Sequence, residues 1–157
     1  MDARLGRGLG HMRRLSDGGV ALNVPHLVLE PGGSEGVRFF SLQLSAAARE
    51  ASASITDLPP ELTDFAQTAG AIAKLDLVIS VDTAIAHLAG AMGKPVWIMP
   101  PFVPDRRRLL ERKDSPWYPT ARLFRQKTRG DWGPVVRDVA GALASIVSSS
   151  CLEEILN

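Results

Sequence analysis

Apolar and polar positions along the chain predict an alternation of strands and helices. Leu77–Val81 and Val96–Met99 are almost entirely apolar, a pattern typical of central parallel strands that are covered on both faces. Residues 84–92 lie between these runs, are mostly small and helix-forming, and are followed by Gly93 and Pro95. That ending is typical of a helix C-terminus. The centre of the chain is therefore predicted to be strand, helix, strand.

Further strands are predicted on both sides of this centre. Residues 37–43 and 121–126 are rich in β-branched, aromatic and other apolar positions, and residues 54–58 form a shorter run of the same kind. In this order of elements, the chain is expected to form an α/β domain with a Rossmann-like, mostly parallel sheet and helices on both faces.

Two more helices have recognisable starts. Asp64 precedes Gln67 by three residues in a pattern like a capping box, which predicts a helix that ends near Leu75. Apolar residues recur at helical spacing from about Asp131 and predict a last helix that frays over residues 148–150.

The domain organisation follows from these elements. Residues 1–36 are rich in glycine and predict a flexible or poorly ordered leader. Residues 37–150 are expected to form one Rossmann-like domain, and residues 151–157 a C-terminal tail.

Composition narrows the classes of function. A net charge of +1 is too small for a protein that binds nucleic acid by neutralising phosphates. The single cysteine, Cys151, allows neither a disulfide within the chain nor a cysteine-based metal site. No apolar run reaches the roughly 18 residues that a membrane span needs. We therefore expect a cytoplasmic protein with no metal, no membrane span and no nucleic-acid partner.

The candidate binding site follows the strand that ends at Val81. Ligands of open α/β sheets bind at the carboxyl ends of strands, and a strand that runs directly into a helix presents free N–H groups to an anion such as phosphate. The candidate residues for phosphate binding are Ser80, Asp82, Thr83, Ala84, Ile85 and His87. Residues expected to line the cleft, after neighbouring strands, are Gln43, Pro101 and Phe102.

These residues also have purely structural explanations. Asp82 or Thr83 can serve as a helix cap, and His87 can be a hydrogen-bonded core residue. Trp117 and Tyr118 can stack on a nucleoside base, although aromatic residues in a proline-rich loop commonly clamp that loop onto the domain. From residue types and spacing alone, the chain is an anion-binding α/β domain.

Longer stretches of sequence resemble a known family. Residues 64–69, 75–91 and 94–97, together with 37–43, 101–105, 114–119 and 123–126, are similar to the C-terminal half of the heptosyltransferase-like family 9 glycosyltransferases, as found in bacterial tetratricopeptide-repeat proteins. The family's Asp-Thr-x-x-x-His signature falls on Asp82, Thr83 and His87. The resemblance implies one half of a GT-B fold that holds a nucleotide-diphosphate sugar as substrate, with no cofactor.

The resemblance also implies what this chain lacks. Catalysis in such proteins, an inverting and metal-independent sugar transfer, needs an N-terminal half that has no counterpart in residues 1–36, so the catalytic residues stay unassigned. A parent protein is expected to supply that Rossmann-like half or tetratricopeptide repeats. Ala84 stands where heptosyltransferases usually have glycine, and Leu44 where related sequences often have lysine.

Two other readings stay open. These substitutions and the missing half favour a non-catalytic binding or interaction module, that is, a degenerate or truncated glycosyltransferase-like domain. A different Rossmann-like nucleotide enzyme is disfavoured because no glycine-rich loop follows any predicted strand.

Overall fold

Six parallel strands form the centre of the fold in a computed structural model, which describes residues 20–23, 37–42, 55–57, 64–102, 115 and 117–155. The strands lie in the order β3-β2-β1-β4-β5-β6, and every neighbouring pair is parallel. Their bounds are β1 Val20–Asn23, β2 Phe39–Ser41, β3 Ile55–Asp57, β4 Leu77–Val81, β5 Val96–Met99 and β6 Ala121–Leu123. The helices are α1 Phe65–Ala73, α2 Ala84–Ala91 and α3 Gly133–Ile155.

The strand order reverses between β1 and β4. From this pair the sheet grows outward through β2 and β3 on one side and through β5 and β6 on the other. This is the order of a doubly wound Rossmann-like sheet, whose ligands bind near the carboxyl ends of the strands at the reversal.

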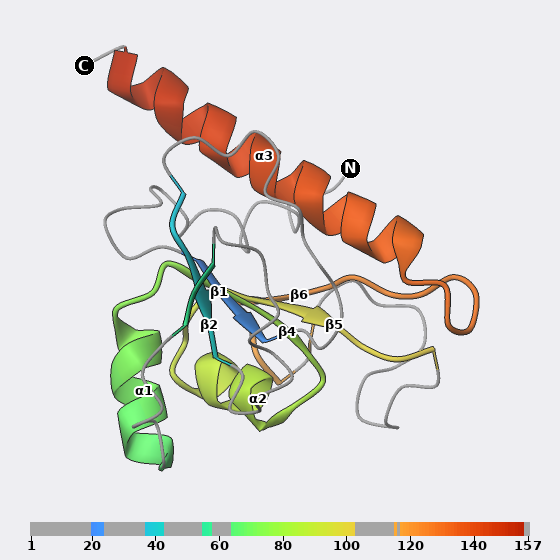
Figure 1. Ribbon diagram of the computed structural model, residues 1–157, viewed down its shortest axis with the longest axis horizontal. Helices are drawn as coiled ribbons and strands as arrows, with labels where there is room; N and C mark the ends of the chain where they lie inside the picture. The colour runs from blue at the N-terminus through green and yellow to red at the C-terminus, as the bar shows by residue number, and fades with distance from the viewer. Residues whose placement is uncertain are drawn as a thin grey trace.

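Helices cover both faces of the sheet, as Figure 1 shows with α3 on one face and α1 and α2 on the other. Alternate residues of β4 face the two layers: Leu77 and Ile79 pack in one core cluster with Val139 of α3, whereas Val78 packs in the other with Ile72 of α1. Because successive side chains of a strand point to opposite faces, an apolar run such as β4 is buried on both. The predicted α/β class, parallel sheet and two helical layers are confirmed.

The start of α1 follows the predicted cap. Asp64 has an extended backbone, and its carboxylate accepts a hydrogen bond of 2.7 Å from the backbone N–H of Gln67. The other end of this helix is tied to the loop before β5, because Nζ of Lys94 donates to the carbonyl oxygens of Ala73 and Leu75 at 2.6 and 3.0 Å. A cation at a helix C-terminus is stabilised by the carbonyl dipoles there.

The prediction of a leader over residues 1–36 is wrong for Val20–Asn23. These residues form β1, which pairs with both β2 and β4 in the middle of the sheet. Four residues are too short to show a strand period, and their stability as a strand comes from pairing with two neighbours. The remainder of that segment lies outside the described residues.

The last helix is longer than predicted. The helix does not fray at residues 148–150 but continues to Ile155, so α3 includes part of the predicted tail at residues 151–157. Ser145 and Ser148 donate their hydroxyl hydrogens to the carbonyl oxygens of Gly141 and Ala144, four residues back. Serine side chains satisfied in this way are compatible with a helix interior.

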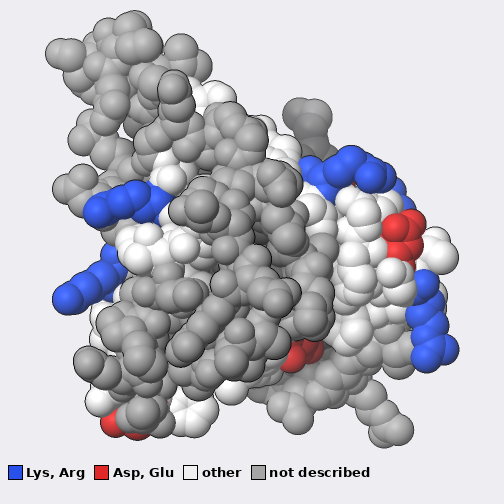
Figure 2. All heavy atoms as spheres, in the orientation of Figure 1, with Lys and Arg blue, Asp and Glu red and all other residues white. Residues whose placement is uncertain are grey.

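Charged side chains do not gather into one patch on the described part of the face in Figure 2, where an acidic group lies between basic groups at the right edge. Among the described helices, none has the length and apolar character required to cross a membrane.

Two glycines provide a matched test of this fold. Gly93 ends α2 with a φ of +70°, whereas Gly70 lies inside α1 with nothing within 4 Å of an added Cβ. Gly93→Ala is expected to destabilise the protein by about 1–2 kcal/mol because a Cβ disfavours the left-handed region. Gly70→Ala is expected to stabilise it by about 0.5–1 kcal/mol through helix propensity. Urea unfolding measures both, and equal effects of the two changes would contradict the assigned backbone.

Candidate functional site

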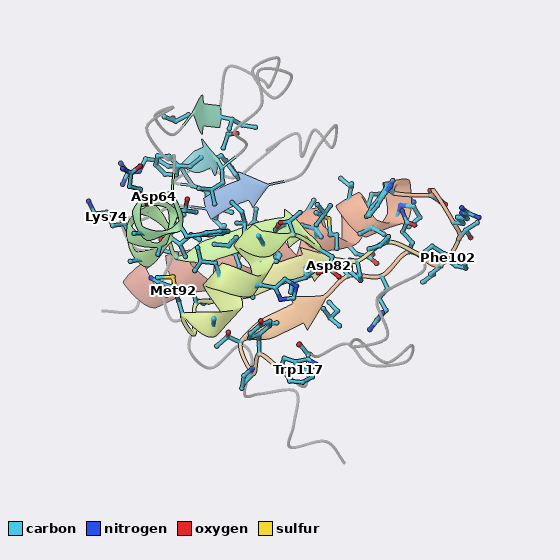
Figure 3. All side chains as sticks on the ribbon, turned by 90° about the horizontal axis from the view of Figure 1, so that it is seen from below. Asp64, Lys74, Asp82, Met92, Phe102 and Trp117 are labelled. Carbon is cyan, nitrogen blue, oxygen red and sulfur yellow. The ribbon has the colours of Figure 1, made fainter. Side chains whose placement is uncertain are left out.

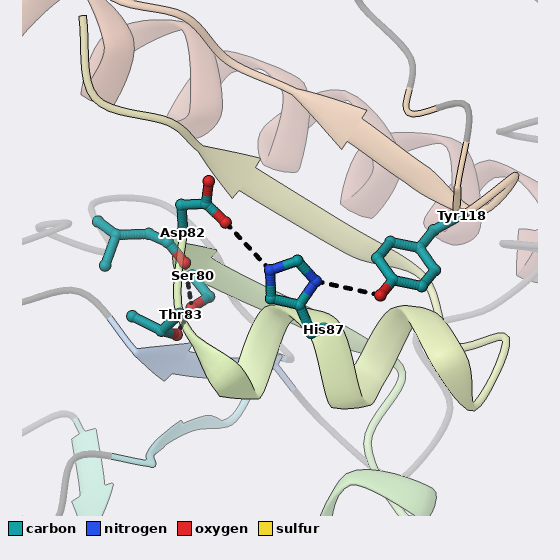
Figure 4. Close-up of polar contacts among 6 residues, drawn as sticks. Ser80, Asp82, Thr83, His87 and Tyr118 are labelled. Carbon is teal, nitrogen blue, oxygen red and sulfur yellow. Dashed lines mark hydrogen bonds and ion pairs between the residues drawn. The ribbon is translucent and has the colours of Figure 1, made fainter. Parts of the chain in front are cut away.

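Strand β4 passes into helix α2 through only two residues, Asp82 and Thr83. Thr83 is the N-cap residue, with an extended backbone of φ −134° and ψ 172°. The fully buried Ser80 fixes the turn, since its Oγ donates to the carbonyl oxygen of Val81 at 2.7 Å and lies 3.0 Å from Oγ1 of Thr83. A serine hydroxyl has one hydrogen, so the Thr83 hydroxyl is the donor in the second contact. Figure 4 shows this arrangement.

The amino end of α2 offers backbone N–H groups. The first intrahelical bond runs from the N–H of His87 to the carbonyl oxygen of Thr83 at 3.2 Å, so helix geometry provides no intrahelical acceptor for the N–H groups of Ala84, Ile85 and Ala86. Thr83 is the N-cap, but its side chain makes no capping hydrogen bond. Together with the positive end of the helix dipole, these donors suit an anion.

A row of three side chains extends along α2 from its amino end (Figure 4). Nδ1 of His87 lies 3.0 Å from the hydroxyl of Tyr118, and Nε2 lies 3.5 Å from Oδ1 of Asp82. The His87 side chain is 44% exposed and that of Asp82 only 16% exposed. The second distance is longer than a good N–H···O hydrogen bond, so the contact is mainly electrostatic. The Asp82 carboxylate therefore faces an imidazole.

Tyr118 packs against the backbone of α2 at Gly90. A Cβ at position 90 would lie 2.5 Å from Cγ of Tyr118. The Tyr118 and His87 rings meet edge to face, with centroids 5.8 Å apart. Tyr118 therefore clamps its loop onto the domain, one of the two roles considered from sequence.

The residues after β4 and β5 lie at the same end of the sheet. In Figure 3, Asp82 and Phe102 lie toward one end, and Lys74 and Met92 toward the other. The register pairs Val81 with Met99, the last residues of the two strands. Pro101 and Phe102 come after the buried Pro100 and are exposed, Phe102 at 44%.

The structure brings only some of the predicted site residues together. Ser80 joins Thr83, and Asp82 joins His87, but Thr83 and His87 have different partners within the chain. Asp82 is not the N-cap of α2, because the helix begins one residue later. Gln43 lies outside the described residues. Within the described part of the chain, no three of His, Cys, Asp and Glu are placed to hold a metal ion.

Gly90 is a site residue that sequence reasoning missed. A glycine within a helix is a known sign of close packing, but the signal does not identify the partner. Tyr118 lies 28 residues further along the chain, and only the fold brings it to α2.

Comparison with known proteins points to one family. Residues 41–98 match the model of glycosyltransferase family 9 (heptosyltransferase), which is somewhat more than a third of the chain. The chain is also similar to the protein FlbA of Caulobacter vibrioides, with 36% identity over 93 residues. That alignment covers 59% of this chain but only 15% of FlbA, so the chain spans a small part of this relative. The family match supports a glycosyltransferase-type function for the matched region, which includes β4, α2 and most of β5.

Ser80 allows a test of the strand-to-helix turn. Ser80→Ala removes the hydroxyl contacts to Val81 and Thr83 and is expected to lower the free energy of unfolding by about 1–2 kcal/mol. Ser145→Ala is the matched control, because its hydroxyl is exposed and donates to a carbonyl oxygen of its own helix, and it is expected to stay within about 0.5 kcal/mol of the wild type. A loss no larger for Ser80→Ala than for the control would show that the turn does not depend on the buried hydroxyl.

Proposed function

We propose that this chain binds a nucleotide-diphosphate sugar, with the diphosphate at the amino end of α2, as the donor-binding part of a longer sugar-transferring enzyme. One observation carries the proposal. Strand β4, one of the two strands at which the strand order reverses, turns directly into α2, and this turn lies within the residues that match glycosyltransferase family 9.

The chemistry of the site fits the leaving group of sugar transfer. Negative charge develops on the diphosphate as the bond to the sugar breaks, and oriented donors stabilise that charge. The N–H groups of Ala84 and Ile85 supply such donors without a metal ion. His87 lies one turn further along α2, where its imidazole faces the Asp82 carboxylate at 3.5 Å.

The neighbouring strand ends offer room for the remainder of the ligand. Parallel strands lie about 4.8 Å apart, so the residues after β5 stand within the span of a nucleotide sugar whose phosphates lie at α2. Phe102 exposes its ring there, which suits contact with a base or a sugar face.

Complete catalysis belongs to the parent protein in this proposal. Inverting transfer needs a base on the acceptor hydroxyl, and we assign no such base among the described residues. A second Rossmann-like half of a GT-B enzyme, joined to this one in a longer chain, is expected to supply the base and the acceptor site.

A non-catalytic module is the second candidate. It is favoured by the contacts that Thr83 and His87 make within the chain, to Ser80 and to Tyr118 and Asp82. Such contacts stabilise the fold whether or not a ligand binds. Titration with nucleotide sugars distinguishes the two candidates.

Ala84→Pro tests the helix donors directly. Ala84 is the first helical residue, where proline is tolerated, and the extended backbone of Thr83 is compatible with a following proline. The change removes one N–H group and leaves the helix in place. We expect calorimetric titration with UDP-, GDP- and ADP-sugars to give about 10-fold to 100-fold weaker binding of the preferred donor, because a hydrogen bond to a charged group is lost.

Ala84→Val is the control for bulk, since it adds a branched side chain and keeps the N–H group. It is expected to bind more tightly than Ala84→Pro. Equal binding by the wild type and Ala84→Pro would remove α2 from the site. No binding of any nucleotide sugar by the wild type would favour the non-catalytic module.

A further inference from the structure

Tyr118 is held in place both through the backbone of its own turn and through the contact of its ring with α2. Its carbonyl oxygen accepts from the N–H of Ala121 at 3.0 Å, in a turn that leads into β6. Oγ1 of Thr120 donates to the carbonyl oxygen of Lys94 at 2.8 Å, which joins this turn to the loop after α2. The phenol ring then lies against α2 at Gly90, where no other residue leaves room for it. These contacts together hold the hydroxyl of Tyr118 next to His87.

The contacts of His87 favour one arrangement of its ring hydrogens. A neutral imidazole has one N–H donor and one bare nitrogen that accepts. The Tyr118 hydroxyl, 3.0 Å from Nδ1, donates well to a bare Nδ1, and this places the ring hydrogen on Nε2. Nε2 faces the Asp82 carboxylate at 3.5 Å, where a hydrogen is attracted and a lone pair is repelled.

We propose that Tyr118, seated on Gly90, is a positioning residue that selects the His87 tautomer with hydrogen on Nε2 and so keeps the Asp82 carboxylate paired with the imidazole. The consequence for binding rests on the proposed function. A carboxylate close to the amino end of α2 opposes a diphosphate there, and an N–H group directed at that carboxylate reduces the opposition. Tyr118 thereby prepares the site without touching the ligand.

Nitrogen-15 NMR of the full chain, labelled at histidine, tests the tautomer. The chain has three histidines, and His87→Gln identifies the signals of His87. At about pH 8, where an ordinary imidazole is neutral, the wild type is expected to show a protonated Nε2 and a bare Nδ1. Tyr118→Phe keeps the ring on Gly90 but removes the hydroxyl, and the two nitrogen signals should move toward each other as the second tautomer becomes populated.

Two more variants make the test specific. Gly90→Ala displaces the Tyr118 ring and should change the nitrogen signals in the same direction. Trp117→Phe alters the adjoining aromatic residue, which is 66% exposed, and should leave them unchanged. The proposal is overturned if Tyr118→Phe leaves the His87 signals as in the wild type, or if Trp117→Phe shifts them equally. If Gly90→Ala does not fold, Tyr118→Phe alone still decides the question.

Titration with the preferred nucleotide sugar tests the consequence separately. Tyr118→Phe is expected to weaken binding by about 2-fold to 10-fold, the usual effect of one hydrogen bond. If Tyr118→Phe changes the tautomer but not the affinity, Tyr118 does not prepare the site for the ligand. The tautomer assignment would then still stand. Absence of binding by the wild type would overturn the proposed function instead, and the NMR result would stand by itself.

Discussion

The shortness of the connection between β4 and α2 is the constraint on which the site depends. Strand β4 is buried by core clusters on both faces, and two residues later the helix has begun. With so short a connection, the direction of α2 follows from the position of β4, and the amino end of the helix stays at the edge of the sheet. Ser80 holds the turn from inside through contacts with Val81 and Thr83.

The strand order of the sheet makes the turn between β4 and α2 a candidate ligand site. Its strands extend in opposite directions from β1 and β4, so the carboxyl ends of this pair mark the place where doubly wound proteins bind ligands. On the same edge, Pro101 and Phe102 follow β5. On the outer side of α2, Gly90 admits Tyr118, and Tyr118 reaches His87. The packing of one helix against a loop thus determines how the imidazole next to Asp82 is held.

Sequence patterns predict the helices and strands whose own residues show an apolar period or a cap. They fail for elements that form only through contacts with residues far away in the sequence. The apolar runs of β4 and β5 and the cap at Asp64 are readable because burial on two faces and a side-chain cap leave local marks. Strand β1 has only a weak mark of this kind, the three apolar residues Val20–Leu22, and these become a central strand by pairing with β2 and β4. The sequence predicts the end of α3 too early because serines that bond to their own helix resemble a fraying end.

The candidate site shows the same division. The turn at Asp82 and Thr83 follows from strand and helix patterns, and its resemblance to glycosyltransferase family 9 agrees with the match over residues 41–98. The contacts of His87 with Tyr118 join residues 31 positions apart and require the folded chain.

The most direct test of the proposed diphosphate site is backbone amide NMR during titration with inorganic pyrophosphate. If the amino end of α2 holds the diphosphate, the largest shifts fall on the amides of Ala84, Ile85 and Ala86, whereas shifts confined to other parts of the chain would contradict that assignment.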